Sequence, residues 1–301
     1  MYDVCCVGET MVVLAPEPAG PLGDADLLRR GVGGAESNLA CYLAGLDLRV
    51  GWVSRLGADP FGAHVRATLS AAGVDCSLVE TDPDAPTGVY FKDPGRSVYY
   101  YRRGSAASRM DRTVWGAVAN AGTRYVHVSG ITAALSESCA DLMAHLLTDR
   151  PVEGAVVSFD VNYRPALWKP AVAGPALAAL ANKADLVFVG LDEAATLWGA
   201  TTPDDVRAAL PGPATLVVKD GDVGATSYGP DGSVFVAAPR VTVVEPVGAG
   251  DAFAAGYLFG ALRGLDAGAR LSIGHRVAAV ALGTAGDFAP PPSPEALLTK
   301  G

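Results

Sequence analysis

The stretch that decides the fold is "VEPVGAGDAFAAGYL", residues 244–258. It overlaps "VTVVEP", which has the β-branched composition of a strand end, and it runs into "AFAAGYLFGALRG", which has the length and apolar content of a helix. The glycine-rich turn between them places Asp251 at the start of that helix. First-turn N–H groups lack partners and the helix dipole favours an anion, while Gly248 and Gly250 allow a phosphate to approach the backbone closely.

Asp251 has two interpretations at such a position. Aspartate is among the best residues for capping a helix N-terminus, so the residue could serve only the helix. A negative side chain beside an anion site is unfavourable, however, unless the chemistry needs it. That favours a base that takes a hydroxyl proton while the amides hold a phosphoryl group in transfer.

The rest of the chain alternates between strand and helix patterns. This alternation predicts an α/β fold with a mostly parallel sheet covered by helices on both faces. Cys5 and Cys6 are expected in a buried strand of that sheet. The strand patterns are at 3–9, 49–57, 124–130, 154–162, 185–190 and 214–221, and helix patterns include 37–48, 60–74 and 273–283.

Residues 86–104 break this alternation. "TGVYFKD", the turn "PGR" and "SVYYYRR" have the pattern of an antiparallel hairpin with one wet face. The segment 9–32 is expected to add strands to it. We therefore predict a single domain over 1–301, with a small antiparallel β lid contributed by about 9–32 and 86–104.

Composition limits the classes of partner. The 301 residues are 50% hydrophobic, and the formal net charge of -9 with only five lysines argues against a nucleic-acid partner or a basic membrane anchor. No apolar run reaches about 18 residues, and the N-terminus has no basic leader. Five cysteines without metal-ligand spacing suit reduced thiols. We expect a cytoplasmic protein with a small-molecule partner.

The sequence lacks the characteristic motifs of several common enzyme classes. The sequence has no G-x-x-x-x-G-K-[ST] loop, no G-x-G-x-x-G after a strand, no G-x-S-x-G and no H-E-x-x-H. This argues against a Walker-type ATPase, a dinucleotide oxidoreductase, a serine hydrolase and a zinc protease.

Two motifs resemble the signatures of the ribokinase-like carbohydrate kinases, the PfkB family. They are "GVGGAESNLA" at 31–40 and "EPVGAGDAFAAGYL" at 245–258, where Glu245-Pro246 replaces the usual Asp-Thr. The resemblance spans essentially the whole chain and implies a three-layer α/β/α ribokinase-like fold and ATP-dependent phosphorylation of a sugar. It also makes Asp251 the catalytic base and assigns the anion hole to the amides of Gly248, Ala249 and Gly250.

Within the family the chain most resembles the 2-keto-3-deoxygluconate kinases. Along "SVYYYRR", Tyr99, Tyr101 and Arg103 share one face and Val98, Tyr100 and Arg102 the other, so one face can cover a ligand. A solvated or dimer-packing face remains the alternative for these residues, as a plain helix cap does for "GGAESN". The resemblance places these residues against the acid sugar: Gly34, Asn38, Tyr90, Tyr101, Arg103, Arg164, Asp251 and Asp287.

The nucleotide side follows from the same resemblance. "FVGLDEA" lies where the family has an Asn-x-x-Glu motif that arranges Mg²⁺, with Gly190 in place of the Asn, so Glu193 is the metal candidate and Asp192 a weaker one. His275 stands where the family usually has Asn, and a structural histidine is the alternative. The residues expected at ATP are Asn162, Arg164, Lys219, Gly221, Gly224, Gly248, Ala249, Gly250 and His275.

The implied function is transfer of phosphate from ATP to the terminal 6-hydroxyl of an acid sugar, 2-keto-3-deoxygluconate in particular. A neutral-sugar kinase of the fructokinase or ribokinase type remains open, as does the choice between the gluconate and galactonate epimers. A sugar or nucleotide sensor on an inactive kinase fold predicts loss of the base, whereas Asp251 is present. The apolar hairpin also predicts a homo-oligomer formed through the lid.

Overall fold

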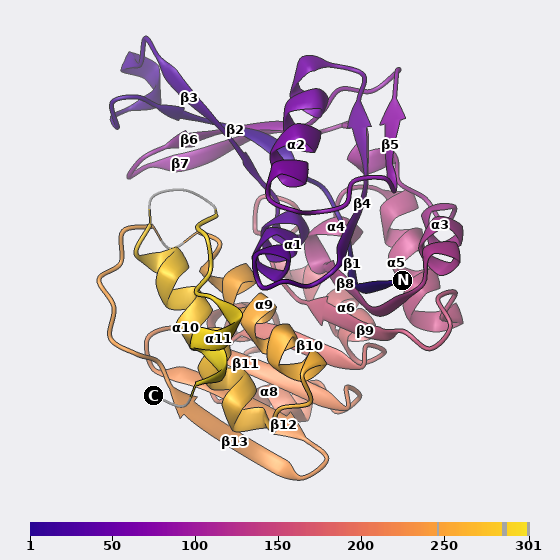
Figure 1. Cartoon of the computed structure of the whole chain (residues 1–301), viewed down its shortest axis with the longest axis vertical. Coiled ribbons are helices and arrows are strands. Elements are labelled where there is room, and N and C mark those ends of the chain that lie inside the picture. The colour runs from indigo at the N-terminus through magenta and orange to yellow at the C-terminus, as the bar shows by residue number, and fades with distance from the viewer. Residues whose placement is uncertain (246, 285–287, 300–301) are drawn as a thin grey trace.

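A computed structural model describes residues 1–245, 247–284 and 288–299, and its main feature is a central sheet (Figure 1). Within those residues nine strands pair in the order β13-β12-β11-β10-β9-β8-β1-β4-β5. Neighbours from β11 to β5 are parallel, and β12 and β13 add an antiparallel hairpin at one edge, so the predicted, mostly parallel sheet is confirmed. The strands are β1 (Tyr2–Val7), β4 (Val50–Gly57), β5 (Val79–Asp82), β8 (Thr123–Ser129), β9 (Val156–Asp160), β10 (Leu186–Gly190), β11 (Thr215–Asp220), β12 (Gly224–Gly229) and β13 (Gly232–Ala237).

Helices cover both faces of this sheet, which gives the expected three layers. Strand β1 shows why: Val4 and Cys6 pack into the core on one face, and Cys5 and Val7 into the core on the other. On the first face lie α1 (Ala35–Gly45), α2 (Pro60–Ala71), α9 (Ala249–Leu262), α10 (Ala267–Leu282) and α11 (Pro294–Leu298). On the second lie α3 (Val114–Ala121), α5 (Glu137–Asp149), α6 (Pro170–Ala181), α7 (Leu191–Trp198) and α8 (Pro203–Ala209). Short helices α4 (Gly130–Ala133), η1 (Leu22–Asp24) and η2 (Ala107–Arg109) complete the described helices.

The ends of these helices follow local sequence rules. Helix α2 begins after Asp59, whose side chain accepts a hydrogen bond from the Gly62 amide at 2.8 Å, with Pro60 in the first turn.

No helix within the described part of the chain has both the length and the apolar character needed to cross a bilayer.

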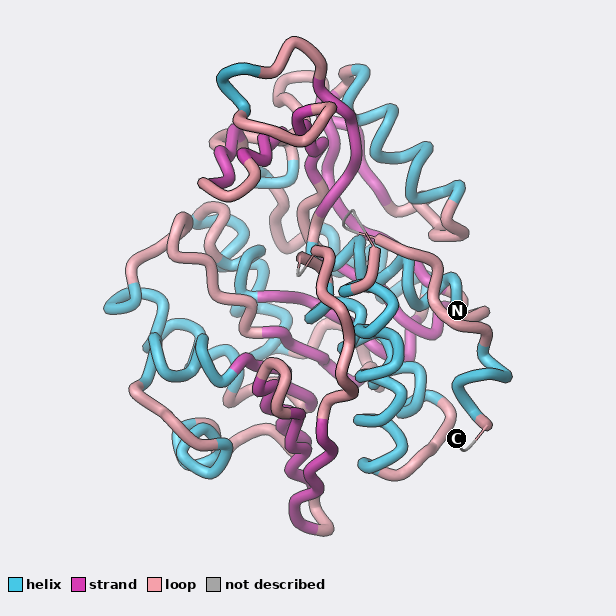
Figure 2. The backbone as a smooth tube through the Cα atoms, turned by 90° about the vertical axis from the view of Figure 1, so that its left-hand side faces the viewer, coloured by secondary structure: helices cyan, strands magenta, loops and turns pink. Residues whose placement is uncertain are grey.

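A second sheet stands apart from the central one at the top of the molecule (Figures 1 and 2). Its strands are β3 (Leu28–Gly33), β2 (Met11–Pro16), β6 (Val89–Asp93) and β7 (Ser97–Tyr101), in that order. Two of its pairings are antiparallel, as expected, whereas β2 and β6 run parallel because each leaves the central sheet at its start and points the same way. The four strands lie in or next to the segments 9–32 and 86–104 from which we predict a lid, and this sheet is called the lid below.

One predicted strand is absent. The "VTVVE" segment that follows β13 is an irregular loop leading to α9, although its composition favours a strand. The amides of Val244 and Glu245 both donate to the Leu282 carbonyl, at 2.7 and 3.3 Å, instead of joining a ladder. The valine side chains remain exposed, Val243 to 56%, so no sheet face buries them.

Candidate active site

A cavity of about 1450 Å³ lies between the lid and the carboxyl ends of β9, β10 and β11. Met11, Tyr90 and Tyr100 line it from the lid, and the start of α9 lines it from the main body. Open parallel sheets bind ligands at this edge. The volume exceeds the roughly 300 to 1000 Å³ of a typical ligand pocket, which suits two substrates side by side.

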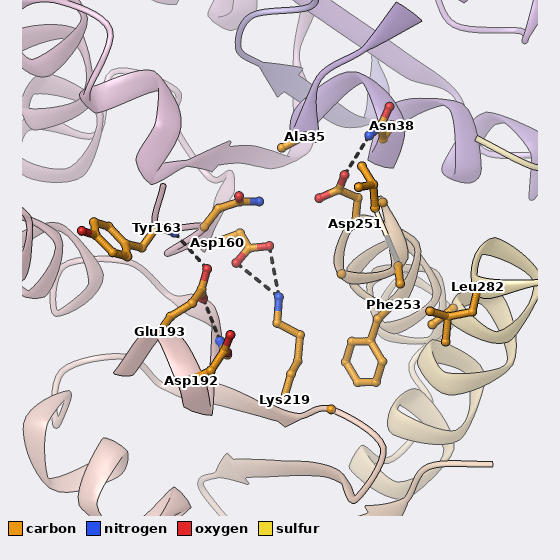
Figure 3. Close-up of a pocket in the computed structure, with 18 of the residues that line it drawn as sticks. Ala35, Asn38, Asp160, Tyr163, Asp192, Glu193, Lys219, Asp251, Phe253 and Leu282 are labelled. Atoms are coloured by element: carbon orange, nitrogen blue, oxygen red, sulfur yellow. Dashed lines mark hydrogen bonds and ion pairs between the residues drawn. The ribbon is translucent and has the colours of Figure 1, made fainter. Parts of the chain in front are cut away.

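Asp251 faces this cavity from the first turn of α9 (Figure 3). The N-cap residue of the helix is Gly248, in the left-handed region at φ 83°, and no side chain caps the helix. The Asp251 carboxylate instead accepts a hydrogen bond from Asn38 Nδ2 at 2.9 Å. The capping interpretation of Asp251 is therefore wrong for this structure.

The surroundings of Asp251 suit a base. The residue is 8% exposed, and burial raises the pKa of its carboxyl to about 7; the hydrogen bond from Asn38 opposes this rise and the nearby Asp160 carboxylate adds to it. A base works best when its pKa lies near the operating pH.

Positive charge gathers at the start of α9. Gly248, Ala249 and Gly250 line the cavity with the first-turn backbone of this 14-residue helix. A Cβ atom at Gly250 would lie 3.4 Å from Lys219 Nζ, so the ammonium group reaches the same point. Burial lowers the pKa of Lys219, but the carboxylates of Asp160, Glu193 and Asp251 outweigh it and the net pKa is raised, so the lysine stays charged.

Lys219 and Asp160 form an ion pair on the cavity floor (Figure 3). The Nζ atom lies 3.3 and 3.4 Å from the two Asp160 carboxylate oxygens. Asp160 ends β9 and Lys219 lies near the end of β11, so parallel strand ends bring the two side chains together. Asp160 was not among the predicted site residues, although it stands in the "SFDVN" strand end beside Asn162.

Glu193 lies at the cavity but its oxygens are already bonded. Oε1 accepts from the Tyr163 amide at 2.9 Å and Oε2 from the Gly190 amide at 2.8 Å. Burial raises the pKa of Glu193, with the Lys219 charge opposing it. Among the described residues no three His, Cys, Asp or Glu side chains group as metal ligands. Asp192 and Glu193 both line the cavity, and carboxylate oxygens of this kind suit a Mg²⁺ ion that would be held mostly through water and phosphate oxygens.

The lid residues require a correction. Tyr101 is 68% exposed with its ring edge on Phe91, and Arg103 is exposed too; neither lines the cavity. Tyr100 and Arg102 line it instead, one residue earlier in each case. The alternation of strand β7 is fixed by contacts that the sequence does not display: Tyr100 packs on Tyr90 with ring centroids 5.5 Å apart, and Arg102 pairs with the buried Glu9.

The other predicted sugar contacts are brought together. Gly34, Asn38, Tyr90 and Arg164 all line the cavity. A Cβ atom at Gly34 would lie 2.3 Å from the Glu9 carbonyl oxygen, so only glycine fits there. The remaining candidate, Asp287, lies outside the described residues.

The predicted nucleotide residues also line the cavity. Gly221 and Gly224 have φ angles of 48° and 154°, which favour glycine, and Asn162 holds a positive φ of 40°. Within the described chain the buried Asn162 Oδ1 has no hydrogen-bond partner. His275 has a structural contact: its Nε2 lies 3.1 Å from the Val236 carbonyl oxygen, which makes that nitrogen the donor.

Residues 1–294 match the pfkB family of carbohydrate kinases. The chain belongs to this family. Two relatives named 2-dehydro-3-deoxygluconokinase, from Bacillus subtilis (strain 168) and Thermoproteus tenax, are 33% and 34% identical to this pfkB kinase. The matches cover 99% and 98% of this chain and 94% and 92% of the relatives. A solved structure of a PfkB protein from Polaromonas sp. JS666 superposes with a TM-score of 0.88 at 36% identity, covering 99% of both chains. The expected carbohydrate kinase class and ribokinase-like fold are thereby confirmed.

Proposed function

We propose that this pfkB kinase transfers the terminal phosphoryl group of ATP to the 6-hydroxyl of 2-keto-3-deoxygluconate, with Asp251 as the base. The observation that carries the proposal is one cavity that holds a buried carboxyl of raised pKa, the amide end of α9 and, among its lining side chains, Arg102 and Arg164. The names of the two relatives, whose matches span nearly the full chain, support the substrate.

The chemical step needs a proton acceptor and an anion hole. Asp251 takes the hydroxyl proton as the sugar oxygen forms its bond to the γ-phosphorus, and the bond from that phosphorus to the bridging oxygen breaks to release ADP. Because Gly248 is the N-cap residue of α9, the anion hole is formed by the amides of Ala249, Gly250 and Asp251, one residue later than the set that the resemblance implied. These amides, with Lys219, meet the charge of the transferring group. Glu193 would hold Mg²⁺ through water, and the ion would supply further neutralisation of the phosphate charge.

Two guanidinium groups account for the preference for an acid. Arg102 reaches the cavity from the lid and Arg164 from the segment after β9, so they approach a sugar from different elements. A guanidinium donates paired hydrogen bonds to a planar carboxylate, each charge-assisted bond contributing roughly 1.5 to 3 kcal/mol. That corresponds to about one to two orders of magnitude in preference over a neutral sugar.

The lid supplies a further part of the proposal. Closure over the sugar excludes water and limits wasteful hydrolysis of ATP.

The lid also ends in edge strands, β3 and β7, and carries exposed Leu27, Tyr99 and Tyr101. We propose that two lids pair through this surface in a homo-oligomer, because unpaired strand edges and exposed apolar side chains favour association.

One assay tests the substrate. ATP consumption is measured with 2-keto-3-deoxygluconate, its galactonate epimer, fructose and ribose under the same conditions. We expect kcat/KM for an acid sugar to exceed that for either neutral sugar by at least about tenfold. A preference for fructose or ribose would contradict the carboxylate clamp, and the neutral-sugar kinase would replace it.

A further inference from the structure

Glu9 is a buried carboxylate at the base of the lid that the chemistry above does not use. It lies in the short link between β1 of the central sheet and β2 of the lid, and its side chain is 0% exposed. A buried carboxylate is costly unless it is paired and hydrogen-bonded, so its partners identify its task.

Both oxygens of Glu9 are occupied from the other link of the lid. Arg102, directly after β7, donates from Nε to Oε2 at 2.6 Å and brings its Nη2 to the same oxygen. Ser105 Oγ donates to Oε1. The chain therefore enters the lid at Glu9 and leaves it at 102–105, and one carboxylate joins the two crossings.

The pocket around the carboxylate leaves it little freedom. A Cβ atom at Gly88 would lie 2.9 Å from Glu9 Oε1 and 2.8 Å from Met11 Cγ, so a side chain at 88 would collide with both. Packing on this side and the hydrogen bonds on the other hold the Glu9 carboxylate in one orientation.

This arrangement fixes the plane of the Arg102 guanidinium. Of its five N–H donors, Nε and Nη2 are directed at Glu9, which leaves the Nη1 pair for a ligand in the cavity that Arg102 lines. The Tyr100 ring, with its centroid 5.8 Å from Arg102 Cζ, adds a second restraint. A free arginine loses side-chain entropy when it binds, and a restrained one has already lost most of it.

We propose that Glu9 is a positioning residue that presets Arg102 for the sugar carboxylate, and this rests on the proposed function. Glu9 offsets part of the charge of Arg102 and occupies its Nε and Nη2 donors, so Arg102 meets the acid through Nη1, while Arg164 approaches from the segment after β9. Specificity for acid sugars then depends on a residue that does not itself bind the sugar.

A double-mutant cycle tests this role. Glu9→Gln, Arg102→Ala and the double variant are compared with the unmodified protein in KM for acid sugar, KM for ATP, kcat and Tm. We expect Glu9→Gln to raise KM for the acid sugar by about tenfold with little change in KM for ATP. In the Arg102→Ala background the same substitution should change KM no further, because Glu9 acts through Arg102.

Controls separate positioning from stability. Asp185→Asn removes a carboxylate from a distant pair with Arg150, and should lower Tm without changing the preference for acid sugars. If Glu9→Gln fails to fold, Ser105→Ala removes the hydrogen bond from Ser105 Oγ to Glu9, together with a longer one of 3.3 Å from the Ser108 amide, and should raise KM for the acid sugar a few-fold. An unchanged KM in the soluble variant, or equal effects of Glu9→Gln with and without Arg102, would overturn the inference.

The failure of the inference differs from that of the proposed function. If the unmodified protein does not phosphorylate acid sugars, both the proposed function and the role of Glu9 are wrong. If it does phosphorylate them, and the effects of the Glu9 and Arg102 substitutions are additive, only the role of Glu9 is wrong.

Discussion

Asp251, the proposed base, has a buried position that carries a cost to stability. Burial raises the pKa of its carboxyl to about 7 in the folded protein, against an ordinary value of 3.8. The folded state therefore retains the proton to higher pH than the unfolded state, and the contribution of this carboxyl to stability is lost as pH rises through that interval. Active-site residues commonly carry such a cost.

The titration of Asp251 predicts a pH profile. The base must be ionised, so kcat/KM should fall about tenfold per unit as pH drops below about 7, and Asp251→Asn should raise the Tm at about pH 8. Stopped assays over pH and thermal unfolding at two pH values check both effects. An acid limb near the ordinary value of a free aspartate would contradict the burial argument.

We expect different effects when the two adjacent arginines of the lid are each replaced. Arg102→Ala should raise KM for an acid sugar by about one to two orders of magnitude, because it removes a donor at the cavity. Arg103→Ala is the matched control and should leave KM unchanged, since Arg103 is exposed outside the cavity. If Arg103→Ala instead raised KM for the acid sugar and Arg102→Ala did not, Arg103 would be the sugar contact, as the sequence analysis predicted.

The prediction of single residues failed in the lid, where the result depends on which face of strand β7 points into the cavity. The family resemblance assigned Asp251, Lys219 and Glu193 to one site, and all three line the cavity at the edge where the parallel strands end. The lid hairpin alternates equally well in either register, and the pairing of Arg102 with Glu9, 93 positions apart, fixes which face is inward. A long-range contact of this kind has no local pattern in the sequence.

At the scale of elements, an ion pair joins the lid to the loop before α9. Lys92 Nζ on β6 lies 3.2 Å from Glu245 Oε2, and both side chains are partly buried. In the proposed function this pair connects the sugar-binding lid to the anion hole at the start of α9. We expect Lys92→Met and Glu245→Gln each to raise KM for the sugar up to about fivefold, as for a pair contributing about 1 kcal/mol. Sugar titrations of the single and double variants measure it; fully additive effects would show that the pair does not act as a unit.

The loop after β13 shows why element prediction has limits. Its valines favour a strand, but the amides of Val244 and Glu245 donate to the Leu282 carbonyl, and no strand pairs with this loop in the part of the chain that the structure describes. Helices and central strands were predictable because burial imposes their periods on the sequence. The lack of a neighbouring strand to pair with leaves no corresponding pattern in the sequence.

At the scale of the whole molecule, the alternation of strands and helices was enough to predict the fold, since parallel strands require helical crossovers. The position of the lid also followed from a local change of pattern at 86–104. The parallel pairing of β2 with β6 did not, because it joins segments about 75 residues apart that no turn connects.

The proposed lid-to-lid pairing predicts a test of assembly. Tyr101→Asp places a charge on the exposed surface of the lid and should dissociate the oligomer, because a buried unpaired charge disfavours the interface. Light scattering after size exclusion measures the mass. A monomeric unmodified protein, or an oligomer unaffected by Tyr101→Asp, would contradict pairing through this surface.

The central claim is that Asp251 removes the proton from the sugar hydroxyl. Asp251→Asn keeps the size of the side chain and its place beside Asn38, and removes the base. Turnover of the variant, measured together with calorimetric binding of sugar and nucleotide, should fall by about two to four orders of magnitude while both ligands still bind. Near-normal turnover, or a loss of binding as large as the loss of turnover, would contradict the account.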